Sequence, residues 1–162
     1  MVSKEVEKLL LKVQKPGRYV GGELNEVIKD KKKVDCRFAF CFPDTYEVGM
    51  SHLGMKILYS LMNAVPYIWC ERVFAPWVDM EEEMIKHNIP LYALESGDPV
   101  SDFDFIGFTL QYELSFTNML NMLRLSGVPI KSCDRKQLKN IVVAPTPQAS
   151  TRATFSSYLP FP

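Results

Sequence analysis

The chain has 162 residues, of which 47% are hydrophobic and 23% charged, and its formal net charge is zero. This length and composition fit one globular domain with its own core. The balanced charge gives no support for a nucleic-acid or membrane-surface partner, because both favour a basic surplus. No apolar run approaches the roughly 20 residues that span a bilayer, and the charged first 14 residues are not typical of a signal peptide.

The cysteines give no sign of a metal site. Cys36, Cys41, Cys70 and Cys133 form no Cys-x-x-Cys pair. A zinc or iron–sulfur site would need closer spacing. We therefore expect reduced thiols, no metal ligands in this chain and a cytoplasmic location.

The hydrophobic pattern predicts alternating strands and helices after an N-terminal extension, residues 1–34, that holds one short helix at 4–13. Strands are predicted at 35–42, 67–75, 91–94, 104–110 and 140–144, and helices at 48–62, 77–87 and 114–126. This alternation predicts an α/β domain over residues 35–144, doubly wound around a mainly parallel sheet. Right-handed crossovers would bring the loops after Phe42 and after Leu110 to one edge of the sheet.

The last 18 residues differ in character from the rest of the chain. Residues 145–162 contain four prolines and no acidic residue, and they show no helix or strand periodicity. We expect this tail to be disordered or loosely attached.

The loop after the first predicted strand is the first candidate site. Asp44 and Glu47 have the spacing of a capping box in which Asp replaces Ser or Thr. A helix start also attracts an anion, but two carboxylates there would repel a phosphate, which disfavours a pyrophosphate site. Gly49 and Ser51 are small, which suits either close helix–sheet packing or the approach of a large flat ligand.

His52 lies in the same predicted helix. It falls on the face with Lys56, Ser60 and Asn63, away from an apolar stripe formed by Met50, Leu53, Ile57, Leu58 and Leu61. Two interpretations stand for it: a side chain that is solvated or covered by another domain, and a ligand or general acid near the strand ends.

A second polar cluster, residues 109–115, follows a buried strand. Ser115 and Glu113 suit the start of a helix. Gln111 and Tyr112 are harder to explain in that way, and their types suit hydrogen bonds to a bound organic ligand or to another domain. Thr109 precedes them at the strand end.

Four segments resemble, in matching order, the N-terminal domain of a family of uncharacterised bacterial radical SAM proteins. They are Phe-Pro-Asp-x-Tyr-Glu-x-Gly-Met-Ser-His-Leu-Gly at 42–54, Glu-Arg-Val-Phe-Ala-Pro-Trp at 71–77, Leu-Glu-Ser at 94–96 and Gly-Phe-Thr-Leu-Gln-Tyr-Glu-Leu-Ser at 107–115. The resemblance covers residues 9–144, and that domain is similar to cobalamin-binding domains of flavodoxin-like fold.

The resemblance implies a partner. In those proteins a radical SAM barrel domain follows, and its Cys-x3-Cys-x2-Cys loop holds a [4Fe-4S] cluster that cleaves S-adenosylmethionine. This sequence contains no such triplet. We therefore expect a fragment, truncated or frameshifted before the barrel, that is not catalytic alone and contains neither the cluster nor the S-adenosylmethionine site.

The resemblance also implies a cobalamin site, with departures. Base-off cobalamin domains carry Asp-x-His-x-x-Gly after the first strand, and Tyr46 stands here where the His would be, between Asp44 and Gly49. Thr109-Leu110-Gln111 matches a later Ser-x-Leu in part, and Pro145-Thr146-Pro147 replaces an expected Gly-Gly-Pro. The candidate cofactor-binding residues are Asp44, Tyr46, Glu47, Gly49, Ser51, His52, Thr109, Gln111 and Tyr112, and we expect cobalamin binding to be weak at most.

Three functions follow from this sequence. The first is an accessory domain that covers the radical SAM barrel and presents a corrinoid or a substrate. The second is a non-catalytic interaction domain with an empty ligand cleft. The third, a flavodoxin-like nucleotide or flavin binder, is disfavoured because no Gly-rich or Ser/Thr-rich phosphate loop follows the first strand.

Overall fold

A computed structural model of the chain describes residues 3–135 and 138–144. Within these residues four parallel strands form one sheet in the order β2-β1-β3-β4. The strands are β1 (Cys36–Phe42), β2 (Ile68–Phe74), β3 (Phe105–Phe108) and β4 (Ile141–Val143). β1 is central, since Phe38 is in register with Cys70 of β2 on one side and with Phe105 of β3 on the other.

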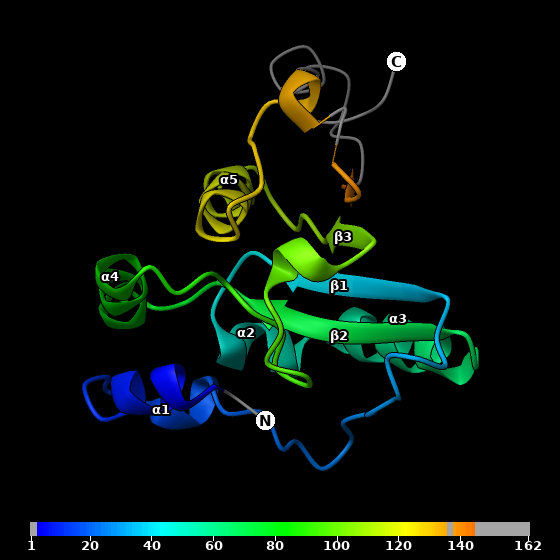
Figure 1. Cartoon of the computed structure of the whole chain (residues 1–162), viewed down its shortest axis with the longest axis horizontal. Coiled ribbons are helices and arrows are strands. Elements are labelled where there is room, and N and C mark those ends of the chain that lie inside the picture. The colour runs from blue at the N-terminus through cyan, green and yellow to red at the C-terminus, as the bar shows by residue number, and fades with distance from the viewer. Residues whose placement is uncertain (1–2, 136–137, 145–162) are drawn as a thin grey trace.

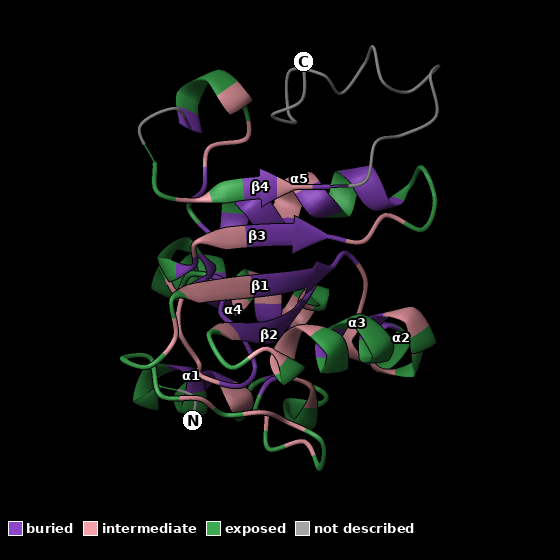
Figure 2. Ribbon diagram, turned by 90° about the vertical axis from the view of Figure 1, so that its right-hand side faces the viewer, coloured by how far each residue is buried: buried purple, intermediate pink, exposed green. Residues whose placement is uncertain are grey.

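Helices cover both faces of this sheet (Figures 1 and 2). They are α1 (Lys4–Leu10), α2 (Tyr46–Ser51), α3 (Leu53–Ala64), α4 (Val78–His87) and α5 (Ser115–Leu125), with short 3-10 turns at Pro16–Arg18, Val100–Asp102 and Ser132–Arg135. The larger apolar cluster joins the sheet to α1, α4 and α5, and the smaller one joins it to α3. The predicted doubly wound α/β fold with a parallel sheet is confirmed.

The strand order fixes where a site is expected. From β1 the chain crosses one face through α3 to reach β2, and from β3 it crosses the other face through α5 to reach β4. The direction of winding therefore changes between β1 and β3. In doubly wound folds ligands bind outside the carboxyl ends of the strands at this switch point.

The outer edge of β2 is closed by side chains rather than by a further strand. Lys29 Nζ donates to the carbonyl of Ile68 at 2.6 Å, and the Asn63 amide both donates to and accepts from the backbone of Cys70. The backbone N–H of Arg72 donates to Glu95 Oε2 at 2.7 Å. An unpaired edge strand is a template for aggregation, so these bonds protect it.

The strand predicted at 91–94 is wrong. That segment makes only one isolated bridge, from Tyr92 to Pro99, and it touches β2 through one backbone bond from Leu94 to Arg72. The chain turns back too soon for a ladder, since Gly97 has a left-handed φ of 76° and donates to the carbonyl of Ala93. The segment is therefore a loop beside β2, and it places Glu95 at the outer edge of that strand.

The single helix predicted at 48–62 is two helices, α2 and α3. His52 separates them in an extended conformation with ψ of 112°, and its Nδ1 accepts a hydrogen bond from the backbone of Met55 at 3.2 Å. The restart changes which face meets the sheet. Met55 and Tyr59 are buried, whereas four residues of the predicted stripe are exposed: Leu53, Ile57, Leu58 and Leu61.

The predicted N-terminal extension contributes to the same core. Val6 and Leu9 of α1 belong to the larger cluster, and the Trp69 indole donates to the carbonyl of Val27 at 2.8 Å. The expectations for residues 145–162 lie outside the described residues. No helix among the described residues is long and apolar enough to pass through a lipid bilayer.

Candidate functional site

The loops after β1 and β3 meet at the carboxyl edge of the sheet, as the sequence predicted. The Thr109 backbone donates to the carbonyl of Cys41 at 3.2 Å, and Asn118 Nδ2 of α5 donates to the carbonyl of Pro43 at 2.9 Å. The Tyr112 hydroxyl reaches Asp44 Oδ2 at 3.4 Å. These contacts bridge the switch point between β1 and β3.

Gln111, Tyr112 and Thr109 of the second predicted cluster differ in how far they are exposed at this edge. Gln111 is exposed, as is Tyr112, so a partner molecule can reach both side chains. Thr109 is half-buried, and its Oγ1 is enclosed without a hydrogen-bond partner among the described residues. A buried hydroxyl without a partner is costly, so Thr109 marks a point where an added acceptor or donor would be stabilising.

The capping box predicted from Asp44 and Glu47 is wrong. The N-cap of α2 is Thr45, and its side chain makes no capping bond. Asp44 Oδ1 accepts from the Thr45 backbone at 2.7 Å instead. Glu47 Oε1 instead pairs with Arg18 Nη2 at 2.8 Å and with Lys15 Nζ at 3.2 Å. The hydrogen bond from Arg18 lowers the pKa of Glu47 to about 2.

Tyr46 points back toward the N-terminal segment. Its hydroxyl donates to Glu23, and its ring packs edge-on against Phe74 with the ring centroids 5.6 Å apart. Burial, followed by the bond to Glu23, raises the pKa of Tyr46 to about 12. The phenol is therefore neutral and already engaged within the protein.

Gly49 is small because of packing. A Cβ at this position would lie 2.2 Å from a ring carbon of Phe74 and 3.2 Å from one of Phe42. α2 can therefore approach the sheet only with glycine here. Of the two interpretations given for Gly49, the structure supports close helix–sheet packing.

The two remaining candidates are occupied by local bonds. Ser51 Oγ donates to the carbonyl of Val48 at 2.8 Å, within its own helix. His52 caps α3 through Nδ1, and its ring lies 5.4 Å from that of Phe42, measured between centroids. Because Nδ1 is used by this backbone N–H, His52 has a structural role at this nitrogen.

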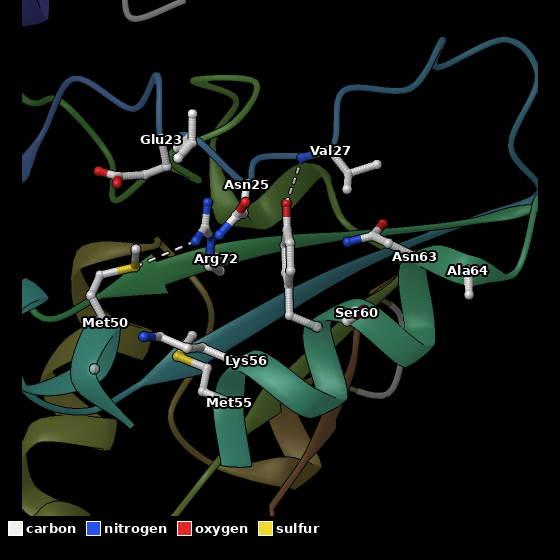
Figure 3. Close-up of a pocket in the computed structure, with 13 residues that line it drawn as sticks. Glu23, Asn25, Val27, Met50, Met55, Lys56, Ser60, Asn63, Ala64 and Arg72 are labelled. Atoms are coloured by element: carbon white, nitrogen blue, oxygen red, sulfur yellow. Dashed lines mark hydrogen bonds between the residues drawn. The ribbon is translucent and has the colours of Figure 1, made fainter. Parts of the chain in front are cut away.

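A cavity of about 570 Å³ opens between α2, α3 and the segment 23–27 (Figure 3). Arg72 of β2 lies between the two walls, with Glu23, Asn25 and Val27 on one side and Met50 and Lys56 on the other. Tyr59 also lines it. This volume is within the range of sites for small organic molecules, roughly 300–1,000 Å³.

Arg72 is 6% exposed and is held by Glu95, which is 2% exposed. Arg72 Nε donates to Glu95 Oε1 at 2.6 Å, and the guanidinium lies over the Tyr59 ring at 4.5 Å. Burial works against the charged arginine, but Glu95 outweighs it, so the pKa of Arg72 is raised. The arginine is therefore charged, and the pair joins the predicted motif segments 71–77 and 94–96.

Sequence reasoning missed the cavity, although it placed Lys56, Ser60 and Asn63 on one helix face with His52. All three line the cavity, whereas His52 does not. The signal for Arg72 was available as a charged pair, Glu71-Arg72, within a predicted buried strand. Charges are seldom buried unless they are paired, so their partners were worth seeking.

The described residues hold no group of three or more His, Cys, Asp and Glu that could bind a metal ion. All four cysteines are free, and burial raises the pKa of the Cys41 and Cys70 thiols. Both are therefore protonated, unreactive thiols in the core.

Comparison with known proteins gives one family. Neither a curated protein nor a solved structure matches this chain. The family model for radical SAM proteins, N-terminal, matches residues 54–159, which begin at α3 and continue past residue 144, where the resemblance was expected to end. The matched range includes β2, the Arg72–Glu95 pair and the loop after β3, and the chain therefore belongs to the family of radical SAM protein N-terminal domains.

Proposed function

We propose that this chain is an accessory domain that packs against a radical SAM barrel domain through the carboxyl edge of its sheet. Family membership as an N-terminal domain implies a radical SAM partner domain in full-length proteins. The cluster-binding Cys-x3-Cys-x2-Cys triplet that the resemblance assigns to the barrel does not occur in this sequence. The radical chemistry would therefore belong to the partner domain.

The observation that supports this edge as the interface is its exposed apolar rim. The segments that follow β1, β2 and β3, including the first residues of α2 and α4, contribute to it: Val48, Trp77, Val78, Tyr112 and Leu114. Their exposed fractions lie between 46% and 74%. Apolar side chains gathered around a polar centre are typical of a protein interaction site.

The residues do not fit a cobalt ligand at the position that the resemblance implies. Tyr46 replaces the histidine, and its hydroxyl is bound to Glu23 while its ring packs on Phe74. Gly49 is required by Phe74 rather than by a ligand. We therefore propose that the chain alone binds cobalamin weakly or not at all, so that the edge acts as an interaction surface.

A binding experiment with a radical SAM domain from a member of this family would test the interface. Isothermal titration calorimetry would compare Tyr112→Ala at the carboxyl edge with Tyr67→Ala at the amino end of β2; the two tyrosines are 48% and 55% exposed. We expect Tyr112→Ala to weaken binding about tenfold, as for an aromatic interface residue, and Tyr67→Ala to leave it unchanged. Equal effects of the two variants would contradict the assigned edge.

A titration with hydroxocobalamin would test the corrinoid prediction separately. We expect no saturable change in the visible spectrum at low micromolar concentrations of purified chain. Saturable binding with a shifted spectrum would show a working corrinoid site. Its loss in Tyr46→Phe would then assign the phenol to that site, and the interface with the barrel would still be tested on its own.

A further inference from the structure

The guanidinium of Arg72 lies on the sheet face that carries the smaller apolar cluster, and its hydrogen bonds are incomplete. Nε is bound to Glu95, whereas Nη1 has only the Met50 thioether at 3.4 Å, and Nη2 has no partner among the described residues. A thioether is a weak acceptor, and a charged donor without an acceptor is expensive to bury. The Nη1–Nη2 edge of this guanidinium is therefore incompletely satisfied.

The groups around this edge indicate what would satisfy it. Lys56 lines the same cavity and makes no ion pair or side-chain hydrogen bond with the described residues. Glu23 also lines the cavity, and Glu95 is bonded to Arg72, so two carboxylates accompany the two cations Lys56 and Arg72. A dianionic phosphate would be repelled by these carboxylates, whereas a singly charged carboxylate would meet two donors in a nearly balanced field.

The remainder of the cavity is suited to an apolar body. Met50, Met55, Val27 and the Tyr59 ring line it beside the polar groups. Methionine side chains are flexible and make favourable contacts with aromatic rings. The volume of about 570 Å³ exceeds what a bare ion needs.

We infer that this cavity binds a small organic carboxylate with an apolar body, and that Arg72 is its buried anchor. The carboxylate takes the Nη1–Nη2 edge in the bidentate geometry that arginine favours. Nη2 is enclosed in the structure, so the Met50 side chain moves aside and its thioether is replaced by a carboxylate oxygen. This inference does not depend on the proposed contact with a barrel domain.

The test uses one carboxylate and its matched neutral analogue. The chain would be titrated with 4-phenylbutyrate, 4-phenylbutanamide and inorganic phosphate, and the methionine methyl groups would be followed by NMR. We expect Met50 and Met55 to shift with 4-phenylbutyrate, while Met84 and Met119, buried on the opposite face, stay unchanged. The amide and the phosphate should leave all four unchanged, since neither matches both the charge and the shape.

Variants locate the anchor. Arg72→Met combined with Glu95→Gln removes both charges together, which avoids leaving one buried and unpaired. We expect this pair to weaken 4-phenylbutyrate binding about tenfold or more, as for a lost charge-assisted bidentate contact. Lys56→Gln should weaken it by a smaller factor, and Lys4→Gln on α1 should change nothing.

Three outcomes would overturn the inference. The first is equal binding of 4-phenylbutanamide and 4-phenylbutyrate. The second is an unchanged affinity for 4-phenylbutyrate in the Arg72→Met, Glu95→Gln double variant. Circular dichroism would show that this variant keeps its fold, and Lys4→Gln is the surface control for binding. The third is no shift of Met50 at about 10 mM 4-phenylbutyrate, since that limit is weaker than the millimolar affinity of even a poor site.

Discussion

The two faces of the sheet are built on different principles. The face covered by α1, α4 and α5 holds a continuous apolar cluster that includes Met80, Phe103, Met119 and Leu123, each fully enclosed. The face covered by α2 and α3 holds a smaller cluster, a cavity of about 570 Å³ and the buried pair Arg72–Glu95. The first face supplies stability, and the second combines a limited core with polar groups suited to binding.

The largest expected effect concerns the buried ion pair of the second face. Glu95→Ala should destabilise the domain by about 3–5 kcal/mol, because it leaves the Arg72 charge buried without compensation and removes the acceptor of the Arg72 backbone N–H. Urea denaturation would measure this. Glu95→Gln removes the charge but keeps an oxygen for that N–H, so it should cost less than Glu95→Ala. An equal loss in both variants would contradict a contribution from the backbone bond, and no loss in Glu95→Gln would contradict an ionic role.

A pair of core truncations would compare the two faces directly. Leu123→Ala, in the larger cluster, should cost roughly 2–5 kcal/mol, since it leaves an enclosed void. Met55→Ala should cost less than Leu123→Ala, because Met55 borders an open cavity and its removal enlarges space that water already reaches. The same denaturation series would show this order, and the reverse order would mean that the second face is the better packed one.

The approach of α2 to the sheet is the next point to test. Gly49→Ala should destabilise the domain by about 1–3 kcal/mol through overpacking against Phe74. Gly17→Ala is a matched control, since a Cβ there meets nothing within 4 Å. If Phe74→Leu in the same chain does not reduce the cost of Gly49→Ala, the contact with Phe74 is not its cause.

The smallest effect concerns Glu47 and pH. Its folded pKa of about 2 lies below the ordinary value of 4.5, so its contribution to stability is present above pH 4.5 and is lost as the pH falls toward 2. Glu47→Gln should therefore be less stable than the parent chain near pH 7. The side chain is 44% exposed, so the loss should be less than about 1 kcal/mol.

Measuring the stability of the parent chain and of the Glu47→Gln variant at two pH values would check this prediction. Thermal melts at pH 7 and at about pH 2.5 should show the difference between Glu47→Gln and the parent chain shrinking as the carboxylate becomes protonated. A difference that grows on acidification would show that Arg18 and Lys15 do not stabilise the charged form.

The sequence by itself determined the four strands of the sheet, the helical segments between them and the meeting of two loops. Continuous apolar runs at 35–42 and 104–110, each followed by a helical pattern, are enough to predict parallel strands whose ends share one edge. That local information placed Asp44 and Tyr112 near each other. The family resemblance also follows from linear motifs, and the family match includes three of them: 71–77, 94–96 and 107–115.

Only the tertiary structure decided what those residues do. The predicted capping box does not form because Glu47 pairs with Arg18, 29 residues earlier. The predicted long helix is interrupted because His52 packs on Phe42 and caps α3 by accepting from the backbone N–H of Met55. The Arg72–Glu95 pair joins residues 23 positions apart across the edge of β2, and the cavity wall comes from the segment 23–27. Spacing along the chain predicts contacts within a helix or strand. The partner of a buried charge depends on three-dimensional proximity and on desolvation, and the linear pattern contains neither.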